Sequence, residues 1–180
     1  VLLMDPGAHS RHEVGSEVIV HISIARNVPS VVGKSRLEAA NKLKAEGGTT
    51  LVACVIYGGC LYFASVGDSG IYLLRGDQLS RLNREQNIEN LEYLVAVRKG
   101  SADPESEDMG LNKAALSHFV GMPQLDEVDF LRRPMRLMPG DMLLLCSDGL
   151  DGSMPLQEME KCLRAGHPEQ CCMMLEQTIA

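Results

Sequence analysis

The stretch MLLLCSDGLDG, residues Met142–Gly152, is the most informative part of the sequence. Its apolar start, Met142–Leu145, follows Pro139-Gly140 and predicts a buried strand entered from a tight turn. The strand runs directly into Asp148, so we expect a backbone fixed in the core and carboxylate oxygens at the rim. Such oxygens suit Mg²⁺ or Mn²⁺. An ordinary Asp-Gly turn, the more frequent use of this pair, explains the same residues.

The composition indicates one globular domain spanning residues 1–180. Of these residues, 45% are apolar and 23% are charged, as in soluble proteins. The net charge of −7 argues against a nucleic-acid partner, and the absence of a long apolar run argues against a membrane span. The six cysteines include no CxxC pair, so we expect reduced, mostly buried thiols in a cytoplasmic protein without structural zinc.

Short apolar runs separated by glycine turns predict a meander of antiparallel strands, not a doubly wound parallel sheet. Gly58-Gly59 is typical of a two-residue hairpin loop. The expected strands and extended segments are 1–4, 49–57, 60–66, 71–74, 79–82, 128–137 and 142–145.

Apolar residues at helical spacing predict helices between these strands. Val14, Val18 and Ile22 recur at a spacing of four and favour a helix over 13–28, ended by Pro29. The acidic stretch at 100–110 lacks periodicity and is expected to form an exposed mobile loop. Further helices are expected at 36–46 (capped by Ser35), 86–98, 112–119, 155–164 and 168–179.

Three aspartates share one placement in this pattern. Asp5, Asp68 and Asp148 each follow an apolar strand and lie at a turn. If the strand ends converge, the carboxylates would repel one another unless a divalent cation lay between them. Two such ions can support hydrolysis of a phosphoester. Spacing alone leaves open the alternative that these are three unrelated turn aspartates.

Two blocks resemble the metal-dependent type 2C (PPM) protein serine/threonine phosphatases. GGTTLVACVIYGGCLYFASVGDSGIYLLRGDQLSRL, Gly47–Leu82, resembles the glycine-threonine strand, the GDSR turn and the hairpin of that family. LMPGDMLLLCSDGLDG, Leu137–Gly152, is similar to its PGDxLLLCSDGL block. VLLMDPGAHSRHEVGSEVIVHIS, Val1–Ser23, looks like the strand that carries DGMGG and the segment after it.

The resemblance implies an α+β fold, a four-layer α-β-β-α sandwich of two antiparallel sheets flanked by helices. It also implies two Mn²⁺ or Mg²⁺ ions and a third, weaker site. By position, Asp5 would bridge the ions, Pro6 would offer its carbonyl, Asp148 would bind the second ion, and Asp68 would contribute to the third site. A metal-activated water would be the nucleophile, so no side-chain nucleophile is expected.

Several features depart from the family pattern. The R-x-x-N-E-D segment at its start and the D-N-x-[ST] segment at its end have no counterpart, so we expect a domain incomplete at both ends. DGMGG is replaced by Asp5-Pro6-Gly7-Ala8-His9, and the arginine of GDSR is Gly70. His9 and His12 lie near the altered loop, where a histidine could bind a softer metal or act as a general acid, although solvated surface is the commoner role.

The resemblance predicts a bacterial-type cytoplasmic phosphatase of signal transduction that hydrolyses phosphoserine and phosphothreonine on a phosphoprotein partner. The altered loop keeps open a catalytically impaired pseudophosphatase, acting as a binding or regulatory module. A third hypothesis is a partner-binding surface on the C-terminal helices, which contain Met154, Met159, Met173 and Met174. Core packing is the more common role of methionines at helical spacing. The sequence predicts no oligomeric state.

Overall fold

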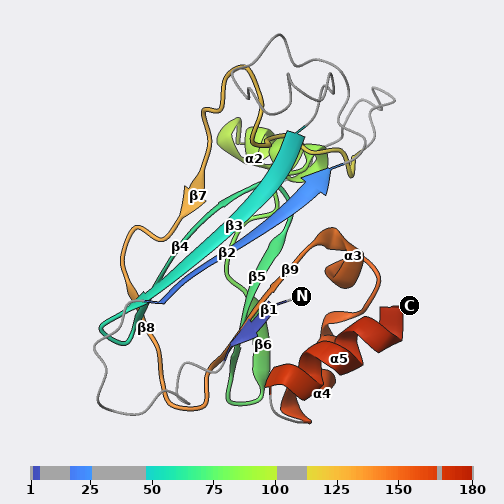
Figure 1. The fold of residues 1–180 in the computed structure, drawn as a ribbon. Helices are drawn as coiled ribbons and strands as arrows, with labels where there is room; N and C mark the ends of the chain where they lie inside the picture. The colour runs from blue at the N-terminus through green and yellow to red at the C-terminus, as the bar shows by residue number, and fades with distance from the viewer. Residues whose placement is uncertain (1, 5–16, 26–47, 101–112, 166–167, 180) are drawn as a thin grey trace, which may run out of the picture.

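The computed structural model describes residues 2–4, 17–25, 48–100, 113–165 and 168–179, which form two antiparallel β-sheets with helices (Figure 1). The predicted α+β class with antiparallel strands is therefore confirmed. The first sheet has the order β1 (Leu2–Met4), β9 (Met142–Cys146), β5 (Gly70–Arg75) and β6 (Gln78–Arg81). The second contains β2 (Glu17–Ala25), β3 (Gly48–Tyr57), β4 (Cys60–Val66) and β7 (Asp129–Phe130), with β8 (Met135–Arg136) also paired to β4.

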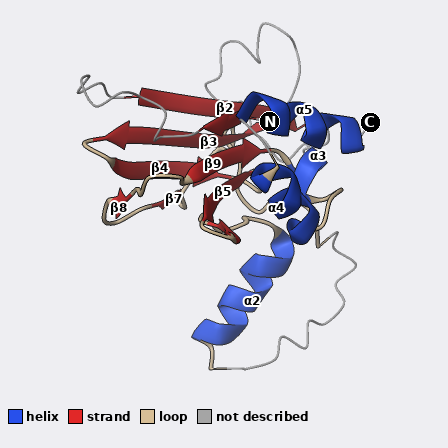
Figure 2. Cartoon of the chain, turned by 90° about the horizontal axis from the view of Figure 1, so that it is seen from below, coloured by secondary structure: helices blue, strands red, loops and turns tan. Residues whose placement is uncertain are grey.

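The C-terminal helices lie against the first sheet. They are α3 (Asp148–Asp151), α4 (Leu156–Arg164) and α5 (Pro168–Ile179). The other helix in the described part of the chain, α2 (Ile88–Arg98), projects away from the sheets (Figure 2). The described part of the chain thus supplies three of the four expected layers, and the helix predicted at 36–46 lies outside it. None of the described helices is long and apolar enough to cross a membrane.

Strands β5 and β9 are buried on both faces, which explains their continuous apolar sequences. Ile71 and Leu73 of β5, with Leu143 and Leu145 of β9, pack between the two sheets. The alternate side chains face the helices and meet the second core cluster, which includes Tyr72, Leu74, Leu144, Cys146, Met159, Leu163 and Leu175. Each of these strands therefore packs against a core cluster on both faces, and this packing fixes the position of the strand ends.

The hairpin between β3 and β4 forms at the predicted dipeptide. Gly58 and Gly59 have φ values of 57° and 71°, which a two-residue turn of the favoured hand requires at both positions. The cysteines described, at positions 54, 60, 146, 162 and 171, are free thiols, and three of them are buried. Burial raises the pKa of Cys54 to about 12, so this thiol stays protonated and packs as a small apolar side chain.

The helix predicted over 13–28 is wrong in its described part. Residues 17–25 form strand β2, antiparallel to β3 with Glu17 opposite Ile56. A spacing of four equals two strand periods, and the run of Val and Ile residues favours a strand.

The short helix predicted at 112–119 is also wrong in its described part. The backbone there forms hydrogen bonds with residues just before α2 and at its start. Ile88 N–H donates to Ala115 O at 2.9 Å, and Ser117 N–H donates to Gln86 O at 3.0 Å. The loop predicted at 100–110 lies outside the described residues, apart from Gly100.

Candidate functional site

Two of the predicted metal-ligating aspartates, Asp68 and Asp148, lie at the same end of the first sheet. Strands β5 and β9 are antiparallel, with Gly70 opposite Cys146. Asp68 is two residues before Gly70 and Asp148 is two residues after Cys146, so the register brings these aspartates to one edge. The pKa of Asp68 is raised to about 6, mainly by burial, then by the charge of Asp148 and to a smaller extent by Glu85 and Asp151. The site is thus a group of carboxylates close enough to repel one another.

The Asp68 turn (residues 67–69) is anchored through its backbone by two buried amides. Gln86 Oε1 accepts from the Gly67 N–H at 2.7 Å, and Gln86 N–H donates to Gly67 O at 3.1 Å. Asn83 Nδ2 donates to Ser69 O at 2.8 Å, while its Oδ1 accepts from the Ile71 N–H at 2.8 Å. These bonds engage the backbone of the turn at Gly67 and Ser69 and do not involve the Asp68 carboxylate.

A contact with Thr50 of β3 also holds the Asp68 turn in place. The Thr50 and Ser69 hydroxyls are 2.8 Å apart and both residues are buried. Gly67 has φ 101°, and a Cβ on it would lie 2.4 Å from Thr50 Cγ2. Only glycine meets both the conformational and the steric requirement here.

Asp148 occupies the first turn of α3 and is exposed, whereas its neighbours hold the helix in place. Leu150 is buried in the core beside the sheet. Asp151 Oδ2 accepts a hydrogen bond of 2.7 Å from Tyr72 Oη. A carboxylate at a helix start is favoured by the unpaired N–H groups there. The chain therefore presents Asp148 to solvent from a fixed backbone, as predicted from the end of its strand.

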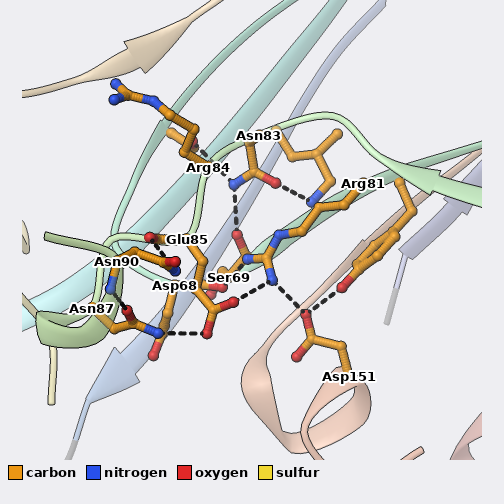
Figure 3. Close-up of polar contacts among 12 residues, drawn as sticks. Asp68, Ser69, Arg81, Asn83, Arg84, Glu85, Asn87, Asn90 and Asp151 are labelled. Carbon is orange, nitrogen blue, oxygen red and sulfur yellow. Dashed lines mark hydrogen bonds and ion pairs between the residues drawn. The ribbon is translucent and has the colours of Figure 1, made fainter. Parts of the chain in front are cut away.

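Arg81 lies among the carboxylates of the candidate site, close to Asp68 (Figure 3). One guanidinium nitrogen, Nη1, is 3.2 Å from Glu85 Oε2 and 3.4 Å from Asp151 Oδ2. The other, Nη2, donates to the main-chain carbonyl of Asp68. Burial raises the pKa of Asp151, an effect that outweighs the Tyr72 hydrogen bond and the Arg81 charge, which lower it. The sequence pattern alone did not identify Arg81, Glu85 or Asp151 as part of the site.

Position 70, where the resemblance places an arginine, has no room for a side chain. A Cβ on Gly70 would lie 2.4 Å from Tyr72 Cε2 and 2.8 Å from Asp151 Oδ2. The aromatic ring and the carboxylate fill this space, and the Arg81 guanidinium lies 5.7 Å from the centre of the ring. The glycine is therefore part of a changed local arrangement.

The other predicted site residues, Asp5, Pro6 and His9, lie outside the described residues, as does His12. The strand before them is described: β1 runs antiparallel to β9, with Leu2 opposite Leu145 and Met4 opposite Leu143. The end of β1 therefore lies toward the start of β9, whereas Asp148 follows its end. The convergence of Asp5 with Asp148 stays a prediction.

The donor chemistry of Asp68 and Asp148 fits Mg²⁺ or Mn²⁺, because both supply hard carboxylate oxygens and, within the described part of the chain, no basic side chain is bound to them. The described residues include no group of three or more His, Cys, Asp or Glu side chains arranged to hold a metal ion. Asp68 and Asp148 thus fit as part of a metal site. A two-ion centre would need further ligands, and the predicted ones, Asp5 and Pro6, lie outside the described residues.

Comparison with known proteins agrees with these features. The Protein phosphatase 2C family profile matches residues 16–92, which include the Asp68 turn and its anchors. The serine/threonine phosphatase stp of Listeria innocua is 34% identical over 118 residues, 66% of this chain and 44% of that protein. The chain is therefore similar to proteins of the protein phosphatase 2C family over these residues. It spans less than half the length of this curated relative.

Solved structures of serine/threonine phosphatases share the fold. The serine/threonine phosphatase PstP/Ppp of Mycobacterium tuberculosis superposes with a TM-score of 0.57 at 26% identity, over 79% of this chain and 57% of that one. The catalytic domain of PstP in complex with two manganese ions gives a TM-score of 0.56 at 24% identity, over 79% and 56%. The two-sheet architecture is therefore that of the phosphatase family.

Proposed function

We propose that the full-length protein is a Mn²⁺- or Mg²⁺-dependent phosphatase that hydrolyses phosphoserine and phosphothreonine on proteins. The observation that carries this proposal is the placement of Asp68 and Asp148 at one sheet edge, as carboxylates to which no basic side chain of the described residues is bound. The names of its relatives, serine/threonine phosphatases, support the reaction and the substrate class. Manganese is supported by the relative solved with two manganese ions.

The roles of the described residues follow from their contacts. Asp68 and Asp148 would hold the ions, and the amides of Asn83 and Gln86 keep the backbone at Asp68 in place. The ions, when bound, supply Lewis-acid activation of water and of the phosphoryl oxygens. No described side chain is assigned as a nucleophile. Ser147 lies before α3, and the Cys146 thiol has its pKa raised to about 12 by burial, so it remains protonated.

A second candidate function is a catalytically impaired module that binds a phosphoprotein without hydrolysing it. The register of β1 favours it, because the end of this strand lies toward the start of β9 and away from Asp148. The replacement of DGMGG by Asp5-Pro6-Gly7-Ala8-His9 points the same way. Either function would take place in the cytoplasm as part of signal transduction, consistent with the free thiols described.

The test is hydrolysis of a phosphothreonine peptide and of p-nitrophenyl phosphate by the purified full-length protein. Mn²⁺ is added stepwise after chelator treatment, with Mn²⁺ binding followed by calorimetry in parallel. We expect the rate to rise with metal occupancy and to return to background with excess chelator. Binding without hydrolysis in a folded protein would contradict the phosphatase and favour the binding module. A folded protein that shows neither Mn²⁺ binding nor hydrolysis would likewise contradict the metal-dependent phosphatase.

A further inference from the structure

The guanidinium of Arg81 lies between two carboxylates of the candidate site. Within contact distance are Glu85 (3.2 Å) and Asp151 (3.4 Å), here called the inner pair, together with the main-chain carbonyl of Asp68. The Arg81 side chain is only 22% exposed. It therefore joins the Asp68 turn, between β4 and β5, to α3, the helix that carries Asp148 (Figure 3).

The surroundings of Arg81 are built to hold a cation. The face of the Tyr72 ring lies beneath the guanidinium at 5.7 Å, and the Tyr72 hydroxyl orients Asp151 toward it with a 2.7 Å hydrogen bond. The buried Nε of Arg81 has no hydrogen-bond acceptor in the described part of the chain. Charge compensation, more than a complete hydrogen-bond set, accounts for this placement.

We propose that Arg81 is the resident cation of the inner pair, which keeps divalent ions out of the space between Glu85, Asp151 and the Asp68 turn. The proposal rests on the proposed function for the kind of ion and goes beyond it in limiting where that ion binds. A guanidinium inside the cluster repels a second cation and occupies the oxygens that would coordinate it. Ions are thereby confined to the outer Asp68–Asp148 edge, and Asp68 contributes to no additional ion site behind it.

The direct test is Arg81→Met in the full-length protein, with Mn²⁺ alone as the probe. Methionine keeps much of the side-chain volume and removes the charge, leaving the inner pair to repel each other. We expect a lower melting temperature in chelator and a rise on adding Mn²⁺ that exceeds the wild-type rise by about 5 °C or more. Calorimetry should count one more Mn²⁺ per chain than in wild type. An equal or smaller rise, with unchanged stoichiometry, would overturn the proposal.

Two further variants separate charge from other effects. Arg81→Lys keeps a cation, so its response to Mn²⁺ should match that of wild type. Arg164→Met is the matched control, because Arg164 also donates to a main-chain carbonyl, that of Asp77, and pairs with Glu160 at 2.6 Å. Asp77 lies in the turn at the opposite end of β5, so this variant should respond like wild type. A response as large as that of Arg81→Met would contradict the proposal.

A folding failure is also informative. If Arg81→Met folds only with Mn²⁺, the proposal is supported. If it folds under neither condition, the double variant Arg81→Met with Asp151→Asn removes one of the repelling charges and should restore folding; no restoration would overturn the proposal. These measurements use no substrate, so a wild-type protein that hydrolyses nothing refutes the phosphatase proposal while the Mn²⁺ responses still decide the role of Arg81.

Discussion

Two turns at opposite ends of the first sheet each carry an aspartate near an arginine, with opposite results. In the Asp141 turn (residues 138–141), Asp141 is 1% exposed and its carboxylate accepts two hydrogen bonds from Arg75, from Nε at 3.0 Å and from Nη2 at 2.7 Å. It also accepts from the Met138 N–H at 2.8 Å. In the Asp68 turn, Arg81 binds the main-chain carbonyl and leaves the Asp68 carboxylate unbound by a basic side chain.

The titration of the two carboxylates reflects this difference. Burial acts to raise the pKa of Asp141, but the hydrogen bonds from Arg75 and Met138 outweigh it and the pKa falls below the usual range. Burial and neighbouring carboxylates raise the pKa of Asp68 instead. A saturated carboxylate stabilises the fold, whereas one held without a counter-charge is available for a ligand. In this sheet, the hydrogen-bond partners distinguish Asp141, which stabilises the fold, from Asp68, whose carboxylate is open to a ligand.

The largest expected effect is on catalysis, at the end of the first sheet that carries Asp68 and Asp148. Asp148→Asn should lower Mn²⁺-dependent phosphatase activity by at least about 100-fold, because the amide removes a charged metal ligand. The free energy of unfolding without metal should stay the same or increase, since one repelling charge is lost. Steady-state rates with p-nitrophenyl phosphate and urea denaturation measure the two quantities. Normal activity in this variant would remove Asp148 from the site.

At the other end of the sheet, where Asp141 pairs with Arg75, a substitution should mainly lower the stability of the fold. Asp141→Asn leaves Arg75 with a neutral partner and weakens three hydrogen bonds, so it should cost about 2–3 kcal/mol of unfolding free energy. Mn²⁺ affinity should be unchanged because Asp141 lies at the other end of β9. Urea denaturation and calorimetry check both points. A variant that loses Mn²⁺ binding while still folded would show that the two ends are coupled.

Two glycine-to-alanine substitutions should have smaller effects on the stability of the fold. Gly67→Ala places a Cβ 2.4 Å from Thr50 Cγ2 at a φ of 101° and should destabilise the fold by about 2 kcal/mol. Gly76→Ala, at φ 58° with open space around the Cβ, should cost only about 1 kcal/mol. Thermal unfolding compares them. Equal losses would mean that the contact with Thr50 does not hold the Asp68 turn.

The smallest effect is the dependence of stability on pH. The folded pKa of Asp141 is lower than the unfolded one, so its contribution is present above the unfolded value and is lost as the pH falls through the folded value. The difference in unfolding free energy between wild type and Asp141→Asn should therefore narrow as the pH is lowered from 5 toward 3. A difference that is constant over this range would contradict the assigned ionisation.

The sequence predicted the strands that meet at the site and both aspartates at their ends. Continuous apolar runs indicated β5 and β9, because both faces of each strand are buried. The four-residue spacing around Val18 led to a wrong prediction of a helix, because the same spacing also fits a strand. Arg81 and the Tyr72–Asp151 contact could not be predicted, since their partners are brought together only by the sheet register; Tyr72 and Asp151 are 79 residues apart.

The most direct test of the central account is a Mn²⁺ titration by calorimetry of the full-length wild type, Asp68→Asn, Asp148→Asn and Asp141→Asn. We predict that wild type and Asp141→Asn bind Mn²⁺ alike, that Asp148→Asn binds it far more weakly, and that Asp68→Asn loses part of the affinity. Folded wild-type protein that takes up no Mn²⁺, or a loss of affinity confined to Asp141→Asn, would contradict the assignment of the Asp68–Asp148 edge as a metal site.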